Sequence, residues 1–428
     1  MGYSIIIFLV FLILGMPVAF SIGLSGLSFF LIRALPMSVL VQKSISTTQG
    51  FTMLAIPLFI LAGNLMNSTG ITKRLMNLAN ICTGHMYGNI GQVSCVLSTL
   101  MGGVSGSAVA DAAMECRILG PEMNRLGYKR GWSAAINGLS GLIVATIPPS
   151  MGLIIYGTVG EVSIGRLFMA GWVPGVLMCV FLMCATSWSA KHYGYKPEHA
   201  QRASFGEIAK AAIDSIWALI FPIMLIVLIR FGIMSPSESG AFACVYALVV
   251  GMFIYKELSW TKFLETLQDS VKDVTVITII LAFSGIFGYG VVFDNLTTSI
   301  ASVLVGITSN STILLILVIM FLLFCGMFME TTVIALILTP ILLPVMQSVG
   351  VDPVVFGMIM MTCVTFGVMT PPVGTALYTV SDIMKCPIEE TVKYGWPFYL
   401  AVALVVVFMV FFPQAVLWLP NMVYGVAA

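Results

Sequence analysis

The stretch IPPSMGLIIY at residues 147–156 is the most informative about the fold, because a similar stretch, TPPVGTALY, occurs at residues 370–378. Each copy places two adjacent prolines, a glycine and a tyrosine inside strongly apolar sequence. Adjacent prolines end a helix, since they remove backbone donors and collide with the preceding turn. The two copies therefore predict two apolar helices that break at matching places.

The spacing between the two copies extends to other residues. Pro149 and Pro372 are 223 positions apart, and Gly171-Trp172 returns 224 positions later as Gly395-Trp396. A paired set of broken helices in two related halves is typical of secondary transporters whose site lies near the bilayer midplane. The chain is therefore expected to contain an internal repeat.

Composition indicates a membrane protein. The 428 residues are 59% hydrophobic and only 9% charged, whereas an average soluble domain carries about 25% charged residues. We therefore expect an all-α polytopic membrane protein in contact with membrane lipid. The net charge of +1 comes with no basic cluster beyond short loops, so nothing indicates a nucleic-acid partner.

The apolar stretches suggest two repeats with two kinds of interrupted segment. Residues of about 89–120 and 312–348 contain small polar residues at membrane depth and then continue without a long polar loop, which favours re-entrant helical hairpins. Broken helices are predicted over 132–157 and 353–381. The expected domains are a first repeat (1–190), a cytoplasmic amphipathic arm (191–213) and a second repeat (214–428). A second amphipathic surface helix is expected at 256–273.

Lysine and arginine placement predicts the orientation. Basic residues flank the first hairpin and fill the loops near 191–213 and 256–273, whereas the loops at 157–165, 292–312 and 347–354 have almost none. By the positive-inside rule the basic loops are cytoplasmic. Five spans plus one hairpin in each half then require that the second repeat is inverted relative to the first.

A dense polar cluster lies at residues 102–111, within the first hairpin. Packing of small residues between helices explains its glycines, but it does not explain Asp111, since an acidic group at membrane depth is costly and marks an ion or substrate path. Hydroxyls, free carbonyls and a carboxylate are hard oxygen ligands that suit Na⁺. We therefore favour a functional site here.

The counterpart in the second half is the segment 325–332, in which Glu330 stands 223 positions after Ser107. The two hairpin tips are expected to meet, each facing a Pro-Pro break. Half-helix N-termini attract anions and half-helix C-termini offer carbonyls to cations, so such a site suits an anionic substrate together with Na⁺. In the alternative interpretation, Glu330 only caps a helix and faces water.

The segment 103–111, the two Pro-Pro breaks and the segment 232–241 (GIMSPSESGA) together resemble the large membrane subunit of tripartite ATP-independent periplasmic (TRAP) transporters. The family has Thr-Pro-Thr-Glu where this chain has Ser-Pro-Ser-Glu at 235–238, a change that preserves both hydroxyls. The resemblance implies an Na⁺-coupled elevator-type importer in the bacterial inner membrane. It also implies two partners, a separate small four-helix membrane subunit and a periplasmic substrate-binding protein.

Geometry and resemblance together suggest the site residues. One Na⁺ is expected near Ser105, Ser107, Asp111 and the carbonyls around Pro148. Another is expected near Gly326, Thr331, Thr332 and the carbonyls around Thr370 and Pro371. The carboxylate substrate is expected to contact Ser105, Gly106, Ser107, Glu330, Thr331 and Thr332.

Other classes fit less well. An enzyme is not indicated, because only three histidines exist and no nucleophile and base are suitably spaced. A channel does not account for duplicated broken helices. The alternative kept open is a stand-alone Na⁺/dicarboxylate symporter with the same two hairpins. The substrate is expected to be a small carboxylate of the sialic acid or C4-dicarboxylate type, selected largely by the binding protein.

Overall fold

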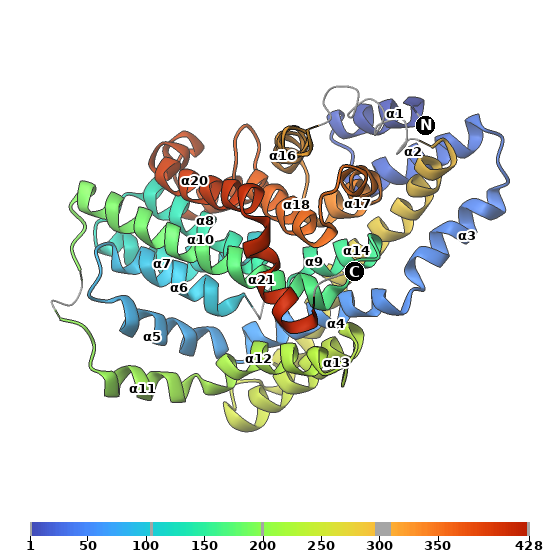
Figure 1. Cartoon of the computed structure of the whole chain (residues 1–428). Coiled ribbons are helices and arrows are strands. Elements are labelled where there is room, and N and C mark those ends of the chain that lie inside the picture. Colours follow the sequence, from blue (N-terminus) through green and yellow to red (C-terminus); the bar gives the residue numbers. More distant parts are fainter. Residues whose placement is uncertain (1, 103–105, 198–200, 296–309, 426–428) are drawn as a thin grey trace.

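The chain is helical throughout the residues that the computed structural model describes, which are 2–102, 106–197, 201–295 and 310–425 (Figure 1). The first part contains α1 (Gly2–Ile13), α2 (Val18–Ile32), α3 (Met37–Thr48), η1 (Phe51–Leu54), α4 (Ala55–Ser68), α5 (Ile71–Thr83), α6 (Asn89–Met101), α7 (Ala108–Arg125), α8 (Arg130–Thr146), α9 (Met151–Val159) and α10 (Ile164–Tyr193). The second contains α11 (Phe205–Asp214), α12 (Ile216–Arg230), α13 (Pro236–Val249), the π-helix η2 (Val250–Ile254), α14 (Trp260–Phe293), α16 (Ser311–Phe328), α17 (Thr331–Ser348), α18 (Pro353–Gly367), α19 (Thr375–Met384), α20 (Ile388–Phe411) and α21 (Pro413–Tyr424).

Several of these helices are suited to cross a membrane. Six described helices are long and apolar enough to span a bilayer, and the number rises to nine if each of three bent pairs counts as one span. Every backbone donor and acceptor in a bilayer must be paired within the protein, which helices achieve. The protein is therefore a multi-pass membrane protein.

Two helices form the centre of the molecule. Residues 131–144 of α8 and 354–367 of α18 are buried without exception. Both helices are apolar or small on every face, which is the pattern of a helix that is surrounded by others. They are also the first pieces of the two predicted broken helices, so the breaks lie at the ends of the most enclosed segments.

Helix starts repeat at the spacing that the sequence suggested. Ala108 and Thr331 begin α7 and α17 and are 223 positions apart, as are Arg130 and Pro353, which begin α8 and α18. The hairpin predicted at about 89–120 corresponds to α6 and α7, and the one at 312–348 corresponds to α16 and α17. Re-entrant insertion, inversion and the domain boundaries at 190 and 213 stay predictions.

The packing of the two halves follows one pattern. Helix α7 packs on α8 and on α19, and its counterpart α17 packs on α18 and on α9. Likewise α6 packs on α8 and α16 packs on α18, while α10 and α20 pack against each other. Each second piece of a broken helix thus lies against the hairpin of the other half, so both halves build one body.

A second group of helices lies beside this body. Helix α14 packs on α2, α3 and α4, and α13 packs on α4 (Figure 1). The separate surface helix expected at 256–273 is wrong, because these residues mostly belong to the continuous 34-residue α14. No proline interrupts that helix. At 1.5 Å per residue it is about 50 Å long, which exceeds a hydrocarbon core of about 30 Å, so its charged first turns are an extension of an apolar span.

The segment predicted as the cytoplasmic arm contains the end of one helix and most of another. Residues 191–193 still belong to α10, and α11 begins at Phe205 with a capping box between Ser204 and Glu207. Helix α11 meets α12 at an angle of 67°. At the C-terminal end, α20 and α21 are separate helices, because Pro413 cannot donate the backbone hydrogen bond that would continue α20.

Candidate functional site

The first helix break separates α8 from α9 by residues 147–150, and the two helices meet at an angle of 42°. Pro148 and Pro149 are buried. The hydroxyl of Ser150 donates a 2.6 Å hydrogen bond to the carbonyl of Ala145 and so ties the start of α9 to the end of α8. The break is therefore a fixed, enclosed stretch of non-helical backbone.

The second break covers residues 368–374, between α18 and α19. Gly374 has a φ of 62°, and its N–H donates a 2.8 Å hydrogen bond to the carbonyl of Met327 in α16. Thr370 donates through Oγ1 to the carbonyl of Phe366 at 2.8 Å, and Pro371 is exposed. The peptide between the two prolines is cis in both breaks.

The first hairpin tip lies against the first break. Gly106 has a φ of +63°, and a Cβ added there would lie 3.2 Å from the carbonyl oxygen of Pro149. Only glycine combines this left-handed conformation with so close an approach. Ser107 is half-buried and caps α7 by accepting from the N–H of Ala110 at 3.5 Å. Ser105 lies outside the described residues.

The second tip is built in the same way but carries a carboxylate. Glu330 caps α17, because its Oε2 accepts from the N–H of Thr332 at 2.9 Å and its Oε1 accepts from the Thr332 hydroxyl at 3.1 Å. The capping role of the alternative interpretation is therefore present, and that Glu330 faces water stays a prediction. Gly326 is buried against α18, where a Cβ on Gly367 would lie 2.6 Å from its Cα.

The two halves meet beside the first break. A Cβ on Gly152 would lie 3.5 Å from the methyl carbon of Thr331, so the second hairpin tip contacts the first turn of α9. Gly106, the break at 147–150 and Thr331 thus lie together, whereas Gly326 lies with the second break, around Met327 and Gly374.

Asp111 lies in the first turn of α7, four residues after the cap Ser107. It is 1% exposed, and its Oδ2 accepts from the Ser98 hydroxyl of α6 at 3.2 Å. Ser98 also donates to Oε1 of Glu115 at 2.7 Å, and Glu115 is fully buried. Among the described residues, the second oxygen of Asp111 has no hydrogen-bond partner.

Glu115 is the centre of a serine cluster. Its Oε2 accepts from the hydroxyls of Ser94 in α6 and Ser140 in α8, the latter at 3.0 Å. The two serine hydroxyls also lie 2.6 Å from each other. Two carboxylates without a lysine or arginine partner among the described residues are thus surrounded by hydroxyls, a costly arrangement in a membrane and one that points to function.

Sequence reasoning missed Glu115 and its three serines. Their signal was present, because Asp111 and Glu115 are four residues apart, as are Ser94 and Ser98, and such pairs lie on one helix face. Thr375 was missed as well. Its buried hydroxyl, at the start of α19, has no hydrogen-bond partner in the described part of the chain.

Comparison with known proteins identifies the family. Residues 5–415 match the family described as the tripartite ATP-independent periplasmic transporter, DctM component. The chain belongs to this family. The large TRAP subunit proposed from the sequence motifs is therefore confirmed, and the family description makes it one component of a three-part periplasmic transporter. Membership in this family implies a small membrane subunit and a periplasmic binding protein as partners.

Two relatives and one solved structure resemble this TRAP subunit along most of its length. The sialic acid TRAP transporter large permease protein SiaM of Vibrio cholerae is 34% identical over 96% of each chain. The C4-dicarboxylate TRAP transporter large permease protein DctM of Rhodobacter capsulatus is 31% identical over 95% of this chain and 96% of its own. The YdaH transporter of Alcanivorax borkumensis shares the fold with a TM-score of 0.61 and 12% identity, over 88% of this chain and 89% of that one.

Proposed function

We propose that this TRAP subunit carries out Na⁺-coupled uptake of a small carboxylate across the bacterial inner membrane, by an elevator movement, from a periplasmic binding protein. The observation that carries the proposal is the meeting of Gly106, the first Pro-Pro break and Thr331, which come from both halves of the chain. A single site shared by two repeats is what alternating access requires.

Helix ends give this site its chemistry. Four helices, α7, α9, α17 and α19, begin at the tips and breaks, and four others, α6, α8, α16 and α18, end there. Helix N-termini carry partial positive charge that attracts a carboxylate, and helix C-termini carry carbonyls that attract a cation. The arrangement therefore suits a substrate anion and Na⁺ bound side by side.

The proposed cation ligands fall into two groups. The first consists of Ser105, Ser107 and carbonyls around Pro148, next to Gly106. The second consists of Thr331, Thr332 and carbonyls around Thr370 and Pro371, with Gly326 close to the second break and the unpaired hydroxyl of Thr375 as an added candidate. Asp111 is proposed to attract the first cation as a nearby negative charge in α7, without being one of its direct ligands.

An elevator movement is consistent with the two helix groups. The hairpins, the broken helices, α10 and α20 would move as one body, because each half supplies contacts that the other needs. Helices α2, α3, α4, α13 and α14 would form the scaffold. Bound Na⁺ offsets the charge of the substrate while it crosses apolar surroundings, where an uncompensated charge costs several kcal/mol.

The substrate class is proposed from the site and the relatives together. Helix N-termini favour a carboxylate, and the relatives SiaM and DctM are named for sialic acid and C4-dicarboxylates. The periplasmic binding protein would select between such anions, because it delivers one substrate to a site that recognises little more than a carboxylate.

Reconstitution tests this function. The complex of this subunit with its small membrane subunit is placed in proteoliposomes, and uptake of labelled sialic acid or succinate is measured with the matching binding protein outside. We expect uptake with an inward Na⁺ gradient and none when K⁺ replaces Na⁺. Uptake that needs no Na⁺ would refute the coupling, and uptake of free substrate by this chain alone would favour the stand-alone symporter.

Orientation has a separate test. Lys129→Cys and Asn310→Cys, each in a background without the nine native cysteines, should react with a membrane-impermeant thiol reagent from opposite sides of the membrane. Reaction from the same side would exclude inversion of the second repeat.

A further inference from the structure

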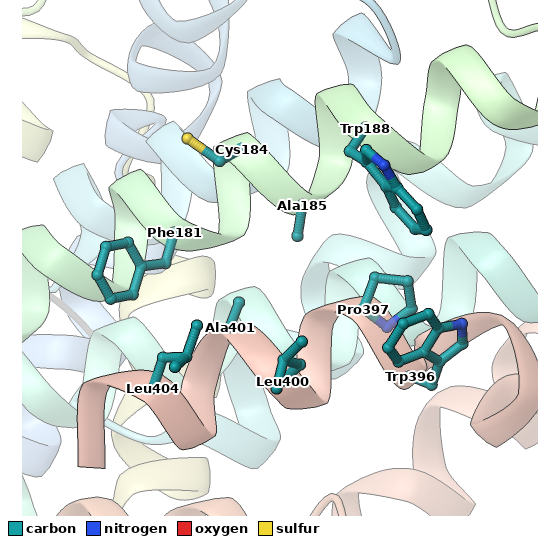
Figure 2. A pocket seen from close by; sticks show the side chains of 9 residues that line it. All are labelled: Phe181, Cys184, Ala185, Trp188, Trp396, Pro397, Leu400, Ala401 and Leu404. Carbon is teal, nitrogen blue, oxygen red and sulfur yellow. The ribbon is translucent and has the colours of Figure 1, made fainter. Parts of the chain in front are cut away.

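An apolar groove runs between α10 and α20, away from the tips and breaks. Its volume is about 350 Å³. Figure 2 shows the small side chains of Ala185 and Ala401 between the two helices, with Trp188 and Trp396 at one end and Phe181 and Leu404 at the other. The groove is concave because small residues form its floor and large ones form its ends.

The length of the groove matches one leaflet. Trp396 and Leu404 are eight positions apart on α20, which corresponds to about 12 Å along the helix axis. Half of a hydrocarbon core of about 30 Å is about 15 Å. A protein helix is about 10–12 Å wide with its side chains, whereas an acyl chain is narrow enough to lie between α10 and α20.

The tryptophan end of the groove has the features of a headgroup region. Trp188 and Trp396 are 57% and 54% exposed and pack edge to face with their ring centres 6.0 Å apart. Tryptophans of this kind gather at the membrane interface. Trp188 stacks on His192, which contacts Tyr193, so the aromatic contacts continue from the groove toward the loops.

Basic residues lie at the same end. Lys129 donates from Nζ to the Tyr394 hydroxyl at 2.8 Å and lies over the rings of Tyr193 and Tyr394. The hydrogen bond to Tyr394 raises the pKa of Lys129, and a lysine side chain is charged at neutral pH in any case. Lys191 lies in the last turn of α10, and Lys393 follows Glu389 and Glu390 in the first turns of α20. Together with exposed Lys196, these lysines outnumber the two glutamates.

We propose that the groove between α10 and α20 binds one acyl chain of an anionic phospholipid from the cytoplasmic leaflet, with its phosphate near Lys129 and Lys191. Headgroup charge and chain are recognised together, because the lysines and the tryptophans lie at the same end of the groove. The lipid lies on helices of the body that carries the tips and breaks, so it is held apart from the substrate.

Fluorescence quenching by brominated lipid tests the proposal. The purified subunit is reconstituted into phosphatidylcholine vesicles that contain brominated-chain phosphatidylglycerol or, at the same mole fraction, brominated-chain phosphatidylcholine. We expect stronger quenching by the phosphatidylglycerol. The excess should disappear in a W188F/W396F variant and persist in W217F/W260F, which removes two other exposed tryptophans.

Further variants, each with a control, distinguish binding of the acyl chain from binding of the lipid headgroup. Ala185→Phe fills the groove and should abolish the excess quenching, while Val180→Phe, at an exposed position of α10 outside the groove, should not. K129Q and K191Q should each weaken the preference for phosphatidylglycerol about fivefold, while K262Q on α14 should leave it unchanged. Equal quenching by both lipids, or an excess that survives W188F/W396F, would overturn the proposal.

Discussion

The two hairpins share one frame but place their carboxylates differently. In the first, Asp111 and Glu115 lie inside α7 and are buried among serines of α6 and α8. In the second, Glu330 lies at the tip, exposed, as the cap of α17. The corresponding cap in the first hairpin is the uncharged Ser107. The duplicated backbone therefore determines where the helices end, while the side chains place the carboxyl groups of the first hairpin in its interior and that of the second at its tip.

The largest effect is expected from closing the breaks, which the two hairpins have in common. Replacing Pro148-Pro149 or Pro371-Pro372 by Ala-Ala should let the helix continue and pair carbonyls that are otherwise open to a cation, and alanine is favoured over proline by about 3 kcal/mol in a helix interior. We expect inserted protein of unchanged or higher thermal stability without Na⁺-driven uptake.

Pro174→Ala provides the control for this change, because Pro174 lies inside the continuous helix α10. Uptake in proteoliposomes should survive this substitution. Uptake that also survives either Ala-Ala variant would mean that the repeated break reflects kinked packing and has no role in cation binding.

The two glutamates should differ in their effect on stability. Glu115→Ala removes the acceptor that three buried serine hydroxyls share, although Ser98 keeps Asp111 and Ser140 keeps the carbonyl of Ile136. It also opens a cavity in the core, so the substitution should cost about 3 kcal/mol. Glu330→Ala removes a helix cap, which costs about 1 kcal/mol, but it should reduce uptake strongly. Thermal unfolding in detergent, followed by intrinsic fluorescence, and uptake assays compare the two. Equal shifts in the unfolding midpoint would contradict the distinction between the hairpins.

Gly106→Ala should destabilise the protein by about 1–2 kcal/mol, since the new methyl group must be accommodated next to the Pro149 carbonyl in a left-handed conformation. Gly127→Ala is a matched control. Gly127 has a φ of +81° but no atom within 4 Å of an added Cβ, so only the backbone strain remains. If the thermal midpoints of both variants shift equally, the close contact between Gly106 and the Pro149 carbonyl does not limit the space at the tip.

The smallest effect on stability is expected for Ser107→Ala, because its cap hydrogen bond is long at 3.5 Å; the loss should stay below about 1 kcal/mol. The Na⁺ concentration that gives half-maximal uptake should nevertheless rise several-fold. Asp111→Asn should shift it in the same direction. Ser163→Ala, which removes a similar cap from α10, should leave it unchanged. An unaltered Na⁺ dependence in Ser107→Ala and Asp111→Asn would assign the polar cluster to helix packing alone.

Much of the frame could be predicted because it depends on local chemistry. The proline pairs locate both breaks, and the broken helices predicted at 132–157 and 353–381 begin close to the observed starts of α8 at Arg130 and α18 at Pro353. Gly106 and the Pro149 region were expected to face each other, and they do. Helix capping and the exclusion of proline from helix interiors act over a few residues, so their signal is readable in a single sequence.

The Glu115 cluster could not be assembled in this way. Its members come from α6, α7 and α8, and only the packing of three helices decides which polar faces meet. The continuity of α14 was missed for a related reason, since the change from charged to apolar sequence near residue 274 resembles a boundary although nothing interrupts the helix there. Ser105, the remaining predicted tip residue, lies outside the described residues.

The crosswise packing of α9 on α17 and of α19 on α7 has a consequence for the history of the chain. A single half would contain a hairpin and a broken helix, yet it would lack the surface against which the second piece of that broken helix packs. An ancestor with one repeat would therefore have formed its site only as a pair of copies. Joining the two copies in one chain would then have allowed each hairpin to change separately.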